Sequence, residues 1–224
     1  MDVMEAIAKR RSIRGFTSDP VPAGLLREIL ETSVRAPSAL NSQPWEFAVI
    51  TGRVLDRIRQ ANVERLYSEE ASASGPSALP WPRYSVYRRR QVELGKALFQ
   101  LMGISREDQE KRKAWRERGF RFFDAPVAII VMADRVLPEA SPLLDIGLVV
   151  ENICLAALAR GLGTCIEDQG IYFPDVLYEH AGIPESKRPV IAIAAGYPDW
   201  DFPANKLQSS REPAENLTTW IGFS

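Results

Sequence analysis

Lys9-Arg10-Arg11-Ser12-Ile13-Arg14 is the stretch of sequence that most narrows the fold and function of this chain. Val3, Met4 and Ile7 share one face of a helix predicted just before it, so the stretch lies where that helix ends. Its three guanidiniums and its hydroxyl can surround a phosphate, because Arg presents a planar fork of donors that matches phosphate oxygens. Taken alone, such a run is more often a solvated basic helix end. Two further segments therefore decide between that interpretation and a phosphate site.

A polar loop is predicted at residues 36–45, Ala-Pro-Ser-Ala-Leu-Asn-Ser-Gln-Pro-Trp. Its two prolines fix φ, and its hydroxyls and side-chain amides can read the edge of a heteroaromatic ring. Residues 205–211, Asn-Lys-Leu-Gln-Ser-Ser-Arg, form a second segment near the other end of the chain. Its terminal Arg211 can bring a second contact to the same phosphate.

Together with residues 161–168, Gly-Leu-Gly-Thr-Cys-Ile-Glu-Asp, these segments resemble the FMN-dependent nitroreductase family over nearly the whole chain. The resemblance implies one domain over residues 1–224 with an α+β, three-layer α/β/α fold around a mostly antiparallel sheet. It also implies an obligate homodimer with FMN sites at the interface and a C-terminal tail that wraps the partner subunit.

The same resemblance assigns FMN contacts to positions of this sequence. The residues that would bind the phosphate and the flavin edge are Arg10, Arg11, Ser12 and Arg14. From the tail, Arg211 and Ser209 would join them; at the position of Ser209 the family often has Lys. The contacts that reach the flavin from the partner subunit are Pro37, Ser38, Ala39, Asn41 and Gln43. The strand that passes the isoalloxazine, with backbone N–H groups near N5, carries Cys165, Ile166, Glu167 and Asp168.

The resemblance implies an enzyme in which the flavin carries the chemistry and no side chain is catalytic. Hydride passes from NADH or NADPH to flavin N5, and then at the same flavin face to a nitroaromatic or quinone acceptor, in a ping-pong scheme. Three alternatives stay open: a same-fold flavin enzyme that dehalogenates or fragments reduced flavin, a flavin-binding module without turnover, and an interaction domain without flavin.

Composition excludes several classes of protein. The 224 residues are 46% hydrophobic and 25% charged, typical of a globular domain, and the net charge of −1 argues against nucleic-acid binding. The longest apolar run, residues 125–133, is shorter than the roughly 20 residues that span a bilayer, and no signal peptide pattern opens the chain. The sequence therefore predicts a cytoplasmic protein with no membrane partner.

Two cysteines and one histidine limit the chemistry of side chains. Cys154 and Cys165 lie in apolar stretches, so we expect core residues in a reducing compartment rather than a disulfide framework or a metal pair. His180 lies in a polar stretch and is expected at the surface. These residues offer neither a metal site nor a Ser/His/Asp triad.

Hydrophobic periodicity predicts the main elements. Helices are expected at 25–33 and 53–67, strands at 46–51, 125–133 and 190–195, and an irregular loop at 68–83. A charged helical excursion at 84–123 would cover the site, with Ser105 capping its second helix. Two roles stay open for its aromatic residues, which either line a pocket over the flavin face or make ordinary packing contacts. They are Trp81, Tyr84, Tyr87, Phe99 and Trp115. The helix at 142–162 is apolar on nearly all sides, which favours a dimer interface.

Overall fold

A four-stranded antiparallel sheet forms the centre of the computed structural model, which describes residues 1–68 and 81–223. Its strands, in the order β1-β2-β4-β3, are β1 (Glu46–Thr51), β2 (Val127–Asp134), β3 (Gly163–Glu167) and β4 (Lys187–Gly196). All three strand pairs are antiparallel. The continuously apolar runs at 125–133 and 190–195 become β2 and β4, the two central strands, as the sequence predicts.

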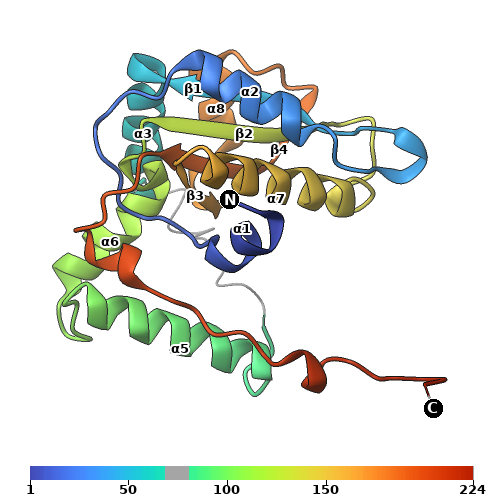
Figure 1. The fold of residues 1–224 in the computed structure, drawn as a ribbon. Helices are drawn as coiled ribbons and strands as arrows, with labels where there is room; N and C mark the ends of the chain where they lie inside the picture. The colour runs from blue at the N-terminus through green and yellow to red at the C-terminus, as the bar shows by residue number, and fades with distance from the viewer. Residues whose placement is uncertain (69–80, 224) are drawn as a thin grey trace.

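Helices cover both faces of this sheet (Figure 1). They are α1 (Val3–Lys9), α2 (Ala23–Ser33), α3 (Gly52–Leu66), α5 (Val86–Leu101), α6 (Gln109–Phe120), α7 (Leu143–Ala159) and α8 (Pro174–Ala181). Alternate residues of β2 point to opposite faces: Val127 and Ile129 pack with α2 and α7, whereas Ala128 and Ile130 pack with α3 and α8. Because both faces are covered, β2 is apolar at every buried position. The predicted three-layer α/β/α fold is confirmed.

The excursion at residues 84–123 contains α5, which lies away from the three layers (Figure 1), and α6, which ends at Phe120 in the core. Asp108 caps α6 by accepting a hydrogen bond from Lys111 N at 3.0 Å, so the prediction that Ser105 caps this helix was wrong. The helix begins at Gln109, four positions after Ser105, which leaves the Ser105 hydroxyl too far back to serve its first turn.

The aromatic residues expected to line a pocket or to pack are divided between packed and exposed positions. Trp115 lies beside Phe123, with ring centroids 6.3 Å apart, and Trp81 lies 5.3 Å from Tyr87. The guanidinium of Arg112 lies 4.8 Å from the centroid of the Phe99 ring. Tyr84 is 93% exposed. The predicted loop at 68–83 falls, for residues 69–80, outside the described part of the chain.

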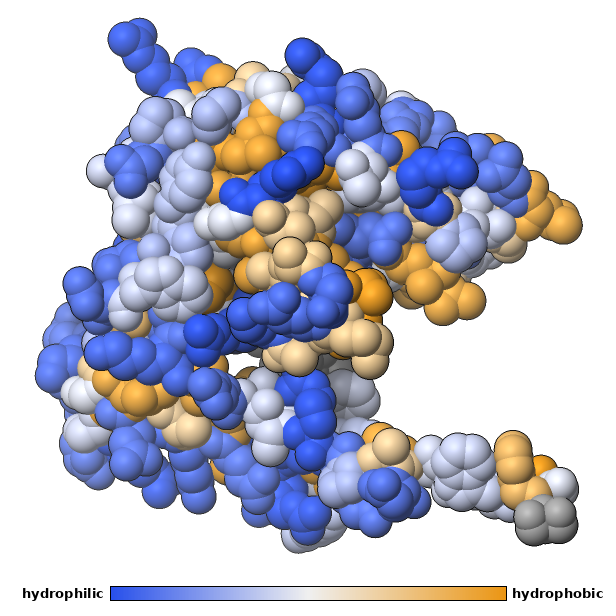
Figure 2. Space-filling model, viewed as in Figure 1, coloured by the Kyte–Doolittle hydropathy of each residue, from blue (hydrophilic) through white to orange (hydrophobic). Residues whose placement is uncertain are grey.

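Two apolar surfaces remain uncovered in the single chain. Helix α7 buries Ile146, Val149 and Ile153 but leaves Leu143, Leu144 and Leu148 between 39% and 75% exposed. The tail after residue 212 extends away from the layers (Figure 1), and its Trp220, Ile221 and Phe223 are at least 70% exposed. Figure 2 shows orange, hydrophobic atoms among paler ones toward the end of the tail. Within the described residues, no helix combines the length and apolarity needed to cross a membrane.

Candidate functional site

The basic segment after α1 pairs with the edge of the sheet. Ile13 N donates a hydrogen bond of 2.8 Å to Thr164 O, and Ser12 forms a parallel bridge with Thr164. Gly163 permits this close approach, because a Cβ there would lie 2.6 Å from Ile13 Cγ1. The segments at residues 9–14 and 161–168, about 150 positions apart in the chain, are thereby placed side by side.

A cavity of about 860 Å³ opens between this segment, the start of β3 and the tail. Its wall includes four cationic side chains, Lys9, Arg10, Arg11 and Arg211, together with the Ser209 hydroxyl. No carboxylate lies among its lining residues. The structure therefore collects Arg10, Arg11, Ser209 and Arg211, which the sequence assigned to one phosphate, around one space.

The cations in this wall keep donors available. Arg10 Nε lies 3.3 Å from Glu151 Oε1, and within the described residues the two terminal nitrogens of its fork make no hydrogen bond. Arg11 lies over the Trp200 ring at 5.1 Å, and its Nε is buried with no hydrogen-bond partner among those residues. Arg211 Nη1 donates to Ser209 Oγ at 2.8 Å, which joins the two tail groups. Such a donor set matches an oxyanion with several acceptor oxygens.

Arg14 lies beyond the cavity wall, further along the same segment. Its guanidinium carbon is 5.9 Å from the centroid of the Phe123 ring. Its backbone N donates to Asn205 Oδ1 at 2.7 Å, and its backbone O accepts from Arg118 Nη2 at 3.0 Å. Asn205 and Arg118 are therefore neighbours of the candidate site that sequence reasoning missed. A buried Asn and a helical Arg carry no local signal of such contacts.

The polar loop at 36–45 lies apart from this cavity within one chain. It contains the short turn η1 (Ala39–Asn41), and Ala39 N donates to Asp145 Oδ2 of α7 at 3.2 Å. Gln43 N donates to Ser38 Oγ at 2.9 Å, and both Asn41 and Gln43 have positive φ, of 57° and 46°. Pro37, Ala39, Asn41 and Gln43 are exposed and Ser38 half-buried. None of these five residues lines the cavity of its own chain.

Side chains at the end of β3 alternate between the inside and the outside. Cys165 is 2% exposed and packs in the core with β2 and α3, whereas Ile166 is 36% exposed. Burial raises the pKa of the Cys165 thiol to about 11. A ligand at the outer edge of β3 would therefore meet Ile166 and the backbone, and the exposed Asp168, but not the Cys165 sulfur.

Glu167 is buried at the same strand end. Its Oε2 accepts a hydrogen bond of 2.7 Å from Gly170 N, while its Oε1 has no hydrogen-bond partner among the described residues. Burial raises the pKa of Glu167 to about 8, against the bond from Gly170 that favours the charged form. The side chain is therefore mostly neutral at pH 7.

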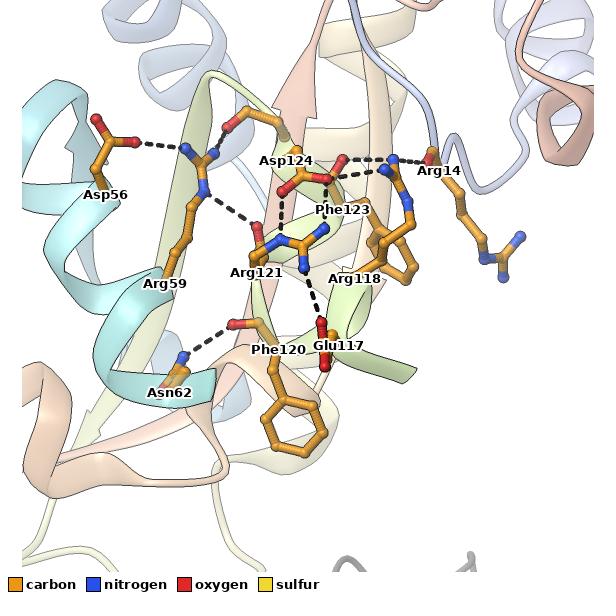
Figure 3. A network of polar contacts seen from close by, with 11 residues as sticks. Arg14, Asp56, Arg59, Asn62, Glu117, Arg118, Phe120, Arg121, Phe123 and Asp124 are labelled. Atoms are coloured by element: carbon orange, nitrogen blue, oxygen red, sulfur yellow. Dashed lines mark hydrogen bonds and ion pairs between the residues drawn. The ribbon is translucent and has the colours of Figure 1, made fainter. Parts of the chain in front are cut away.

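A polar network joins the end of α6 to the segment that carries Arg14 (Figure 3). Phe122, Phe123 and Asp124 have φ values of 55°, 53° and 58°, a conformation that side chains rarely adopt. Arg118 and Arg121 hold Asp124 at 2.8 Å and 2.7 Å. Burial opposes ionisation of Asp124, but these guanidiniums outweigh it and lower its pKa.

The remaining polar residues offer little side-chain chemistry near the cavity. Cys154 and Cys165 are both free and buried, as predicted. His180, half-buried, lies in the last turn of α8, which packs with α3 on the face of the sheet opposite α7. No group of three or more His, Cys, Asp or Glu side chains that could hold a metal occurs within residues 1–68 and 81–223.

Comparison with known proteins agrees with the fold and the segments described above. A family model described as "Nitroreductase family" matches residues 7–197. The chain is 35% identical to the nitrobenzene nitroreductase of Ectopseudomonas oleovorans, covering 97% of this chain and 96% of the relative. It is 32% identical to the 4-nitrobenzoate reductase of Nocardioides sp. (strain LMS-CY), covering 99% and 91% of the two chains.

Solved structures give the same result. The FMN and NADPH-dependent nitroreductase NfnB from Sphigopyxis sp. strain HMH matches with a TM-score of 0.89, 28% identity and complete coverage of both chains. NfnB from Mycobacterium smegmatis, solved in complex with NADPH, matches with a TM-score of 0.87 and 25% identity over 98% of this chain and 100% of that one. The resemblance read from the sequence is thus confirmed, and the chain belongs to the nitroreductase family.

Proposed function

We propose that this protein is an FMN-dependent oxidoreductase that uses NADH or NADPH to reduce nitroaromatic compounds. The observation that carries the proposal is the cationic cavity beside β3, in which Arg10, Arg11 and Arg211 converge. Relatives named for nitrobenzene and 4-nitrobenzoate reduction, at 35% and 32% identity, support this acceptor class over the dehalogenase and flavin-fragmenting alternatives. The NfnB structures, named for FMN and NADPH, support the cofactor and the reductant.

The residues of the cavity fit the phosphate end of FMN. Its lining combines four cations and a serine hydroxyl, and the carboxylate of Glu151 beside Arg10 is outside the lining residues, so cations dominate the wall that a phosphate dianion would meet. The unpartnered, buried Nε of Arg11 is a donor that an oxyanion would satisfy. We assign the phosphate to Arg10, Arg11, Ser209 and Arg211. Ser12 and Arg14 follow toward the flavin ring.

The chain's own residues supply binding and electrostatics. When bound, FMN would supply the two-electron hydride chemistry between the nicotinamide and the acceptor. Arg14 would place a fixed positive charge at the N1/C2 edge, where reduced flavin is negative. The backbone of Ile166 to Asp168 would offer N–H groups to the ring. Because Glu167 is mostly neutral at pH 7, it adds no full negative charge to that strand end.

No side chain of the site needs to transfer a proton. The thiol of Cys165 has a pKa raised to about 11 and is turned into the core, so it is neither nucleophile nor acid at pH 7. Protons for the reduced acceptor would come from water. We propose that nicotinamide and acceptor use the same face of the flavin in turn, in a ping-pong scheme.

We assign the working form to a homodimer. Leu143 and Leu144 of α7 are 51% and 75% exposed, and Trp220 and Phe223 of the tail are 70% and 77% exposed, which is apolar surface that a second copy would cover. In such a dimer the loop at 37–43 would reach the partner's FMN, which accounts for its distance from the cavity of its own chain. The acceptor is a small aromatic molecule.

The two free, buried cysteines support a reducing compartment, so we place the protein in the cytoplasm. We propose no nucleic-acid or membrane partner for this protein.

The visible absorption spectrum of the purified protein tests the proposal. We expect flavin bands that bleach when NADH or NADPH is added without oxygen and that return when nitrobenzene is added. Bands that persist with both nucleotides would point to a flavin-binding module. A colourless protein that takes up no added FMN would contradict the whole proposal.

A further inference from the structure

Arg118 joins the 84–123 excursion to the segment that carries Arg14. It lies on α6, and its Nη1 donates to Asp124 Oδ2 at 2.8 Å. Its Nη2 donates both to Arg14 O at 3.0 Å and to Phe123 O at 3.2 Å. One guanidinium thus touches the helix end, the strained turn and the basic segment, as Figure 3 shows.

The backbone of Arg14 is held on both sides of its Cα. Asn205 Oδ1 accepts from Arg14 N at 2.7 Å, and Arg118 donates to Arg14 O. Asn205 is 1% exposed, so water does not compete for its hydrogen bonds. Because both flanking peptide groups are fixed, the direction in which the Arg14 side chain leaves the backbone is fixed as well.

The side chain of Arg14 itself is left available. Figure 3 shows it pointing away from the Arg118 guanidinium. Its own guanidinium carbon lies 5.9 Å from the centroid of the Phe123 ring. In the described part of the chain no carboxylate forms an ion pair with it within 4.0 Å. A half-buried cation whose backbone is clamped and whose head is unpaired is suited to meet a negative group of a ligand.

We propose that Arg118 is a positioning residue of the flavin site: by holding Arg14 O and Phe123 O together, it aims the Arg14 guanidinium at the flavin edge and ties that aim to the placement of the excursion. The inference rests on the proposed function in one respect, the contact between Arg14 and FMN.

An arginine is required for this role. Its rigid fork reaches three acceptors at once, whereas a Lys ammonium at the same place is a point charge on a flexible stem. The guanidinium also lies over the Phe202 ring at 4.7 Å, which fixes its plane. A lysine would keep the charge beside Asp124 but lose the link between Arg14 O and Phe123 O.

Arg121 provides a matched control. It lies one turn further along, donates to Asp124 Oδ1 at 2.7 Å and pairs with Glu117 at 3.4 Å, but none of its bonds reaches Arg14. Arg118→Gln and Arg121→Gln each remove one guanidinium from the same carboxylate. Any effect that comes only from a weakened turn at Asp124 should therefore appear in both variants.

The test measures FMN binding and the flavin midpoint potential. We expect Arg118→Gln to raise the FMN Kd about tenfold and Arg121→Gln to change it less than about twofold. For Arg118→Gln we expect reduced FMN to lose about tenfold more affinity than oxidised FMN, which lowers the midpoint potential by about 30 mV. Arg118→Lys, which keeps the charge beside Asp124, is expected to lower the potential as Arg118→Gln does, and it serves if the Gln variant does not fold.

A double substitution isolates the route. If Arg118 acts through Arg14, adding Arg118→Gln to Arg14→Gln should leave the FMN Kd of the single Arg14→Gln variant unchanged. Additive losses, equal effects of the Arg118 and Arg121 substitutions, or an unshifted potential would overturn the inference. Failure of the unsubstituted protein to bind FMN would instead overturn the proposed function, so the two failures are distinguishable.

Discussion

Asn205 and Arg14, 191 positions apart in the chain, are joined by a hydrogen bond of 2.7 Å between Arg14 N and Asn205 Oδ1. The same amide accepts from Gly15 N at 3.2 Å and donates to Gly15 O and to Asp199 O, both at 2.7 Å. This one side chain thus fastens the segment after β4 to the segment after α1. The tail that carries Ser209 and Arg211 starts from that point, so the amide helps to close the cationic cavity.

Replacing Asn205 with Ala should destabilise the protein by about 3 kcal/mol. The substitution removes the acceptor of the N–H groups of Arg14 and Gly15, and each unsatisfied buried group costs about 1–3 kcal/mol. Urea unfolding of the FMN-free protein measures the loss. The matched control is Asn216→Ala, because Asn216 is exposed and bonds to Glu212; it should change stability by less than about 0.5 kcal/mol. Equal effects of the two substitutions would contradict the clamp.

Replacing Arg10 or Arg211 with Ala should each raise the FMN Kd by about 10- to 150-fold. Both line the cavity, and a charged hydrogen bond contributes about 1.5–3 kcal/mol. Fluorescence titration with FMN measures the change, which should shrink as salt is added. Lys206→Ala is the control, since Lys206 belongs to the same tail but does not line the cavity. FMN retention that is unchanged in both Arg variants would reject the phosphate assignment.

The parts of this site that follow from sequence are those with a local pattern. The apolar run of β2, the strand at 46–51 and the convergence of Arg10 with Arg211 are all predictable, the last through family resemblance. The turn at 122–124 is not, because Phe-Phe-Asp contains none of the residues that favour positive φ apart from Asp124. Its conformation is held by Arg118 and Arg121, which bind Asp124, and by Arg59 of α3, which donates to the carbonyls of Arg121 and Ala125 on either side of the turn.

Orientation is equally hidden from the sequence. The pattern places Cys165 and Glu167 beside the predicted ligand but does not say which side of β3 they occupy. Which side each occupies is fixed by the pairing of β3 with β4 on one edge and of Ser12 and Ile13 with Thr164, about 150 positions away, on the other. Contacts of that sequence separation depend on the whole fold rather than on any local period.

Glu167 should make stability fall as pH rises. Burial raises its folded pKa to about 8, above the 4.5 of the exposed side chain. The folded state therefore holds a proton that the unfolded state has released between those two pH values. Its stabilising contribution is complete below pH 4.5 and is lost as pH rises toward 8, with a slope of up to about 1.4 kcal/mol per pH unit.

Urea unfolding at pH 5, 6.5 and 8 measures this slope. Glu167→Gln keeps an acceptor for Gly170 N but cannot ionise, so it should remove the slope and be more stable than the unsubstituted protein at pH 8. The exposed Glu185, replaced in the same way, should leave the slope as it was. Parallel curves for the Glu167→Gln variant and the unsubstituted protein would show that Glu167 ionises normally.

Replacing Leu144 with Glu should convert a dimer into a monomer and release FMN. Leu144 is 75% exposed on the uncovered face of α7, and a carboxylate there would have to be buried without a partner when two copies meet. Light scattering after size-exclusion chromatography gives the mass, and the absorption spectrum gives the flavin content. Loss of both together follows if the loop at 37–43 reaches the partner's FMN, since a monomer then lacks the flavin contacts that this loop supplies. Val136→Glu, at an apolar residue that is 83% exposed just after β2, should leave mass and flavin unchanged. An unsubstituted protein that binds FMN as a monomer would show that each chain completes its own site.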